Sequence, residues 1–195
     1  MTIVKRLDKG SELTYSELDG NFTDLDDRMV IQEEDDFGWV TVSDSGGDIA
    51  LTLADTEYKL TNDGLGGQTD LTYGVSGHKN PWNTVTSQIE LDDLKVGDRV
   101  QFRLNLSTIL SGPNRELTTT VNFGIGALVP SVPLFSLVVD NRSYKSQGTK
   151  DANIEFSAVI QSVLMKDYPA EITFQSDSTG DSVNVEGVVI TSFIR

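Results

Sequence analysis

The sequence predicts a mainly β protein, an antiparallel β-sandwich of jelly-roll type that follows a short helical arm. From about residue 38 onward, apolar and polar residues alternate in short runs, as they do in strands with one buried face. Clusters of Gly, Asn, Asp and Ser separate these runs, giving about eight to ten strands at the spacing typical of sandwiches. No repeat of roughly 20 to 50 residues is visible, which disfavours solenoids and propellers. A two-sheet jelly roll fits best, and a five-stranded barrel with added elements is the alternative.

The expected strands lie between these turns. In chain order they fall within residues 38–43, 49–54, 57–61, 71–73, 84–91, 91–109 (after a turn at 95–98), 117–128, 132–140, 152–165, 170–177 and 182–194. The strand that follows the turn at 95–98 has one dry face and one wet face. Its dry face consists of Val100, Phe102, Leu104 and Leu106, and its wet face of Gln101, Arg103, Asn105 and Ser107. The last strand is strongly apolar at alternate positions and is expected to run through the core.

Two runs carry more apolar side chains than one inner face requires, namely residues 133–139 and 188–190. Such a strand is either central and covered on both sides by its own domain, or covered on one side by another copy of the chain. The sequence leaves both explanations open.

Residues 10–29 have a helical pattern. Thr14 and Glu17 form a capping box, in which each side chain accepts a hydrogen bond from the backbone N–H of the other residue. The apolar residues that follow share one stripe with coiled-coil spacing: Leu18, Phe22, Leu25 and Met29. Isolated helices shorter than about 12 to 15 residues are marginal in water, and Gly20 weakens this one by about 1 kcal/mol. The stripe therefore needs a surface, which is its own β-domain, copies of itself or another protein.

Composition limits the classes of partner. The 195 residues suffice for one good core, contain no cysteine and carry a net charge of −15. Residues 1–36 hold four basic and eleven acidic side chains, and the run 33–36 is interpreted as solvated. No basic face is apparent, so we expect no nucleic-acid partner. The apolar stretch 126–139 is broken by two prolines and is too short to span a bilayer, and no secretory signal is visible, so we expect a soluble protein without a membrane partner.

The residues offer little for catalysis. His78 is the single histidine, no serine lies in a nucleophile elbow, and no Gly-rich loop precedes a helix, so we expect no enzyme, no catalytic residue and no cofactor. The loop 62–81 holds oxygen ligands that suit Ca²⁺, namely Asn62, Asp63, Gln68 and Asp70. The same residue types build ordinary turns, which is the favoured interpretation, so no metal site is expected.

Aromatic side chains raise the question of glycan binding. Trp82 follows His78 and Lys79 in an expected exposed loop, so His78 and Trp82 are the candidate contacts with a host surface glycan. Tyr73 and Tyr144 are further candidates for stacking on a sugar, whereas Trp39 lies in a strand pattern and is expected to pack in the core or an interface.

The segment KGSELTYSELDGNFTDL resembles a short segment near the N-termini of many tailed-bacteriophage virion proteins, commonly tail-fibre proteins and related surface components. The matching residues are Lys9, Gly10, Ser11, Leu13, Thr14, Glu17, Leu18, Asp19, Asn21, Phe22 and Leu25. Glu12 departs from the pattern, since proline is frequent there. The segment covers about a tenth of the chain, and its motif is more specific for a virion structural protein than for a part of the particle. The β-region is similar in style to the trimeric jelly-roll knobs of such proteins.

This resemblance implies that residues 1–36 form an anchoring arm and residues 37–195 a knob at the virion surface, assembled in the host cytoplasm. The anchoring and trimerising residues would be Leu13, Tyr15, Leu18, Phe22, Leu25 and Met29. The partners would be sister chains in a homotrimer and capsid or tail proteins. No stalk separates arm and knob, which favours a capsid decoration or short head-fibre protein over a short tail fibre or receptor-binding tip. An unrelated carbohydrate-binding sandwich is a more distant alternative.

Overall fold

The computed structural model describes residues 14, 21–22, 38–44, 46–63, 69–73 and 80–194. The chain divides into two compact units, residues 1–37 and 38–195, which we describe separately. In the first unit, Asn21 and Phe22 are helical and the Phe22 side chain is 67% exposed. The other expected anchoring residues lie outside the described part of the chain: Leu13, Tyr15, Leu18, Leu25 and Met29.

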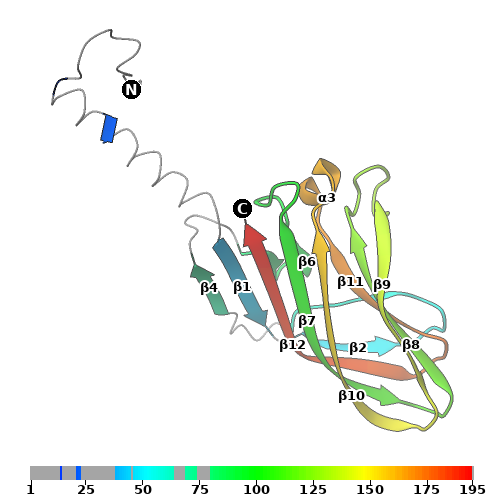
Figure 1. The fold of residues 1–195 in the computed structure, drawn as a ribbon. Helices are drawn as coiled ribbons and strands as arrows, with labels where there is room; N and C mark the ends of the chain where they lie inside the picture. Colours follow the sequence, from blue (N-terminus) through cyan, green and yellow to red (C-terminus); the bar gives the residue numbers. More distant parts are fainter. Residues whose placement is uncertain are drawn as a thin grey trace. The chain divides into compact units, whose positions relative to one another are not determined.

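The second unit is built from antiparallel strands (Figure 1). The strands are β1 (Gly38–Asp44), β2 (Asp48–Leu51), β3 (Tyr58–Lys59), β4 (Thr69–Tyr73), β5 (Trp82–Asn83), β6 (Gln88–Ile89), β7 (Arg99–Leu110), β8 (Arg115–Phe123), β9 (Phe135–Tyr144), β10 (Gly148–Val159), β11 (Glu171–Ser176) and β12 (Asp181–Ile194). A short helix, α3 (Val163–Asp167), lies between β10 and β11. In the described part of the chain, no helix is long and apolar enough to cross a membrane.

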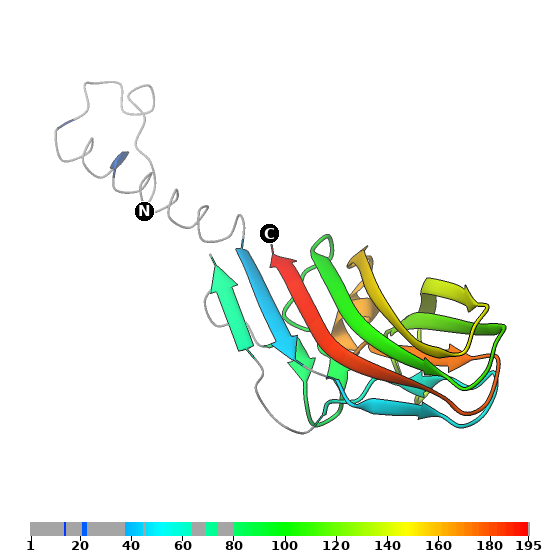
Figure 2. The same ribbon diagram turned by 90° about the horizontal axis from the view of Figure 1, so that it is seen from below.

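The strand order is that of a jelly roll. Among the described residues, the larger sheet has the order β10-β7-β12-β1-β4, with β2 also paired to β12, and the smaller sheet has the order β3-β11-β8-β9. The chain crosses between the two sheets from β2 to β3, from β3 to β4, from β7 to β8 and at each step from β9 to β12. This places β2-β12-β7-β10 against β3-β11-β8-β9, the double Greek key of a jelly roll. The predicted antiparallel jelly-roll sandwich is confirmed, whereas most of the predicted helical arm lies outside the described residues. Figure 2 shows β1 and β4 continuing the larger sheet beyond β12.

The core lies between the two sheets. In β7, Val100, Phe102 and Leu104 are fully buried while Arg103 and Asn105 are exposed, as the alternation predicts. The Phe102 ring meets Phe123 of the facing sheet edge-to-face, with 6.4 Å between ring centroids. The final strand supplies Val183, Val185, Val188 and Ile190 to the same core, which confirms its predicted central position.

β1 and β2 follow one another along the same edge of β12. β1 pairs with Val188–Ile194 and β2 with Asp181–Asn184. Between them the chain passes very close to β12 at Gly46, whose N–H donates to the Val185 carbonyl at 2.9 Å. The β12 register shifts between Val185 and Gly187 at this point, so a bulge in β12 accompanies the break between β1 and β2.

Three predicted strands extend well beyond the observed ones. The strand expected over 117–128 ends at Phe123, because Gly124 takes a positive φ of 65° and begins a turn. Within 84–91 only Gln88–Ile89 is a strand, because the Asn83 side chain accepts hydrogen bonds from the Val85 and Thr86 N–H groups at 3.0 Å each and bends the chain into a turn. The strand expected over 152–165 ends at Val159. It gives way to α3, whose cap is the Ser162 hydroxyl, which accepts from the Met165 N–H at 3.2 Å.

Candidate functional site

The most unusual surface of the second unit surrounds β9. This strand ends the order of the smaller sheet and pairs with β8 from Phe123 opposite Phe135 to Arg115 opposite Tyr144. Among the described strands, none pairs with the other edge of β9. Strand edges of this kind are ready templates for a further chain, and proteins usually shield them with charged residues, prolines or bulges.

The first half of β9 and the loop before it expose large apolar side chains. We name these residues the β9 patch, and their exposed fractions are Leu128 73%, Val129 53%, Val132 48%, Phe135 38%, Leu137 43% and Val138 58%. The loop is folded onto the strand ends, since the Gly126 N–H donates to the Val132 carbonyl at 2.9 Å and the Leu134 N–H to the Phe123 carbonyl at 2.8 Å. The patch is therefore a structured surface.

Both faces of β9 contribute to this surface. Phe135 stacks on the core residue Phe123, with 5.0 Å between ring centroids, so Phe135 and Leu137 lie on the core side of the sheet. The Ser136 hydroxyl donates to the Asn122 side-chain oxygen at 2.5 Å on the opposite side, the side of Val138. Every residue from Phe135 to Val138 is exposed. Of the two alternatives for residues 133–139, burial by the chain itself does not apply to residues 135–138, whereas Val139 is partly buried and packs against the core.

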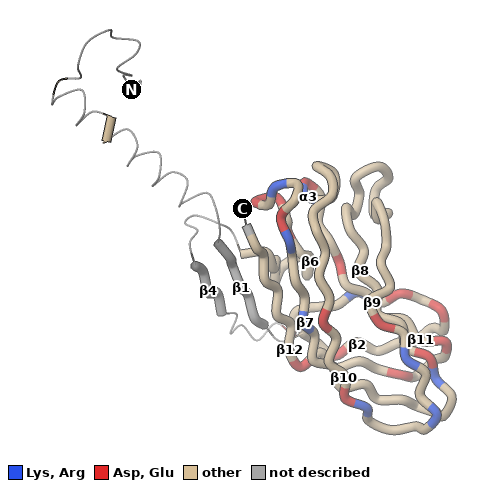
Figure 3. Tube along the Cα trace, viewed as in Figure 1, with Lys and Arg blue, Asp and Glu red and all other residues tan. Residues whose placement is uncertain are grey.

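The β9 patch is also free of charge. Residues 124–139 contain no charged side chain, although the whole chain carries a net charge of −15. In Figure 3 the loop between β8 and β9 and the adjoining part of β9 are accordingly tan throughout. Depletion of charge and enrichment in aromatic and apolar side chains are typical of interface cores.

The second half of β9 differs, because Arg142 ties it to β10. The guanidinium pairs with Asp140 at 2.9 Å and donates to the Asn153 carbonyl of β10 at 3.3 Å. Partial burial acts to lower the pKa of Arg142, but the hydrogen bond and negative charge of Asp140 outweigh it and raise that pKa. Arg142 thus joins the two sheets at the polar end of β9, away from the β9 patch.

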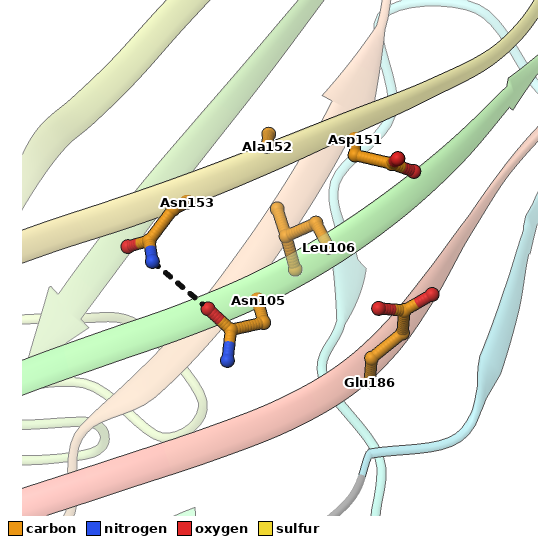
Figure 4. A pocket seen from close by; sticks show the side chains of 6 residues that line it. All are labelled: Asn105, Leu106, Asp151, Ala152, Asn153 and Glu186. Carbon is orange, nitrogen blue, oxygen red and sulfur yellow. Dashed lines mark hydrogen bonds between the residues drawn. The ribbon is translucent and has the colours of Figure 1, made fainter.

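A polar hollow of about 350 Å³ lies on the outer face of the larger sheet (Figure 4). Its lining residues come from three neighbouring strands: Asn105, Leu106, Asp151, Ala152, Asn153 and Glu186. The Asn153 amide donates to the Asn105 side-chain oxygen at 3.0 Å. A Cβ atom at Gly187 would lie 3.3 Å from the amide nitrogen of Asn105, which lines the hollow, so a larger residue there would require Asn105 to shift.

A second hollow of about 250 Å³ lies between β6 and the end of α3. It brings the carboxylates of Glu90, Asp92 and Asp167 near Tyr168, whose side chain is 36% exposed. An aromatic ring beside carboxylates and amides suits a hydroxyl-rich ligand such as a sugar. The sequence pattern did not single out this group, because its members come from distant segments.

The structure corrects the expected position of Trp82. Its side chain is 3% exposed and belongs to the core cluster, so the prediction of an exposed loop is wrong and no ring face is available to a glycan. Tyr144 is half-buried and packs against the core. His78 lies outside the described residues. Trp39 lies in β1 and Tyr73 in β4, two strands of which the structure describes the backbone.

For metals, the described residues contain no group of three or more His, Cys, Asp or Glu side chains that could hold an ion. The Ca²⁺ hypothesis involved Asn62, Asp63, Gln68 and Asp70, of which Gln68 lies outside the described residues. The backbone of Asn62 forms an isolated antiparallel β-bridge with Gly46. The Ca²⁺ hypothesis, which the sequence analysis did not favour, is therefore untested.

No protein-family model matches the chain, and no curated protein matches it. Among solved structures, it is similar to a chain in the structure of infectious bursal disease virus Gx strain, at 12% identity and a TM-score of 0.45, covering 81% of this chain and 32% of that one. It is also similar to Eiger TNF from S. frugiperda, at 9% identity and a TM-score of 0.44, covering 80% and 92% of the two chains. The PRD1 vertex protein P5 matches at 11% identity and a TM-score of 0.38, covering 81% and 72%. At these identities and TM-scores the likenesses carry no argument about function.

Proposed function

We propose that this chain is a non-enzymatic structural protein of a tailed-phage virion, an oligomeric surface appendage attached through its N-terminal arm. The observation that carries the proposal is the segment from Lys9 to Leu25, which resembles the N-terminal segment of such virion proteins. Its apolar stripe requires a partner surface, because a helix of this length is marginal alone. Phe22, the stripe residue that the structure describes, is helical and 67% exposed.

The anatomy of the chain supports a capsid decoration or short head-fibre role. β1 begins at Gly38, directly after the first unit ends at Phe37. A fibre that projects to reach a distant receptor needs a stalk of coiled coil, β-helix or repeats, and no such length of chain separates the two units. One arm and one knob suit a protein that stays close to the particle surface.

Substitutions in the apolar stripe test the arm. We expect Phe22→Ala or Leu18→Asp to abolish binding of the purified protein to particles that lack it, because each removes or charges part of the surface that must be buried. Co-sedimentation with particles measures the loss, and circular dichroism checks that the β-unit is still folded. Glu33→Gln, in the charge run expected to be solvated, is the matched control and should bind normally. Wild-type binding by both stripe variants would contradict an anchoring arm.

A receptor-binding tip is the second candidate function, and the hollow beside Tyr168 is the observation that favours it. Binding of the full-length protein to host cells or to a glycan array, lost in Tyr168→Ala, would support this alternative. A decoration protein should bind neither cells nor glycans.

A further inference from the structure

We propose that the β9 patch is the surface through which copies of this chain contact one another around a three-fold axis. The inference deepens the proposed function, on which it rests for an appendage built from several copies. It concerns Leu128, Val129, Val132, Phe135, Leu137 and Val138 in the knob, and it does not involve the arm.

The first argument is the cost of leaving this surface in water. Six large apolar side chains, each between 38% and 73% exposed, lie on one edge strand and the loop that precedes it. Apolar side chains gathered in this way on a soluble protein mark an interaction site more often than scattered single ones do. A specific interface buries about 800 Å² on each partner, and these six side chains would lie within it.

The second argument is charge, and it favours another copy of the chain over a basic partner. Two chains that each carry −15 repel one another over most of their surfaces. Residues 124–139 contain no charged side chain, so two copies can approach here with less repulsion than at the acidic parts of the surface. A basic partner would be drawn instead to the acidic parts of the molecule, because an uncharged face offers it no electrostatic attraction.

The third argument concerns symmetry. If β9 paired edge to edge with β9 of one other copy, the sheet would become longer but both faces of the strand would stay in water. The exposed residues lie on both faces, with Phe135 and Leu137 on the core side and Val138 on the other side. A strand that is wedged between two neighbours, as in a closed ring of three copies, has both faces covered.

Glutamate substitutions at the most exposed patch positions test this inference. We expect the wild-type protein to sediment at three times the chain mass of 21.3 kDa. The variant Leu128→Glu/Val138→Glu should sediment as single chains, because it places like charges within the interface. Its concentration for half-dissociation should rise by at least about 100-fold. Both side chains are more than half exposed, so the fold should persist, which thermal unfolding checks.

Val85→Glu is the matched control, because Val85 is 92% exposed and lies in the turn before β6, outside the patch. This variant should keep the wild-type mass. A wild-type protein that sediments as single chains, or a double variant that keeps the wild-type mass, would overturn the inference. If the double variant stays a trimer, the arm rather than the β9 patch holds the copies together. The proposed virion role would not be affected by that result. Loss of particle binding by the arm variants, measured separately, tests that role.

Discussion

At the scale of single residues, the Asp181 carboxylate joins the turn that follows β7 to the strands β11 and β12. It is 1% exposed and accepts hydrogen bonds from the Ser111 N–H at 2.8 Å, the Ser111 hydroxyl at 2.9 Å and the Ser176 hydroxyl at 2.6 Å. Arg115 adds a positive charge at 3.8 Å. A buried carboxylate is tolerated when its oxygens are satisfied in this way, so the four residues form one unit.

Removing this carboxylate should destabilise the fold. We expect Asp181→Ala to lower the free energy of unfolding by about 3 kcal/mol, because it leaves the Ser111 N–H and the Ser176 hydroxyl without their acceptor and removes the negative charge beside Arg115. Chemical denaturation measures the change. Asp177→Ala, at an exposed position in the turn between β11 and β12, is the control and should change stability little. Equal stability of the two variants would show that the buried group contributes nothing.

At the scale of elements, the passage of β1 and β2 along β12 depends on Gly46. A Cβ atom at this position would lie 2.6 Å from the Val185 Cβ and 2.9 Å from a Leu60 methyl group, both in the core cluster. We expect Gly46→Ala to lower the free energy of unfolding by about 1 to 3 kcal/mol through overpacking. Ala50→Ser, on the exposed face of β2, should be neutral. Thermal unfolding compares the two, and a neutral Gly46→Ala would mean that the strands separate easily there.

The elements also show which parts of the fold follow from local pattern. The alternation in β7 was sufficient to predict its buried face, because both faces of that strand have a uniform environment. The turn at Thr84–Ser87 depends on one hydrogen-bonding side chain, Asn83, which a count of β-favouring residues overlooks. Trp82 is buried by the packing of the β5–β6 hairpin, which polar neighbours in the sequence do not reveal.

The candidate site was predictable only in part, for a related reason. The run 133–139 was conspicuous for excess apolar side chains, but whether a strand is central or at an edge depends on long-range pairing. Leu128, Val129 and Val132 belong to the same surface through loop contacts. The absence of charge from 124 to 139 was the local signal for the complete patch.

At the scale of the whole molecule, the net negative charge opposes the association of copies, whereas the apolar β9 patch favours it. Salt screens the repulsion between chains of charge −15 but has little effect on contacts between uncharged side chains. We therefore expect the oligomer to become tighter, with a lower concentration for half-dissociation, when the salt concentration is raised from about 0.05 M to 0.5 M. Sedimentation velocity at several protein concentrations measures this. Dissociation by salt would instead indicate an interface held by ion pairs.

The central claim is that this chain is a surface component of a tailed-phage particle. The most direct test is to bind an antibody fragment raised against the knob to intact virions made from the genome that encodes the chain, and to image them by electron microscopy. We predict label spread over the head shell, as a decoration protein requires. Label at the tail would support a virion component but would indicate a tail-fibre protein in place of a capsid decoration protein. Purified particles that carry no label, while the free protein binds the fragment, would contradict the claim.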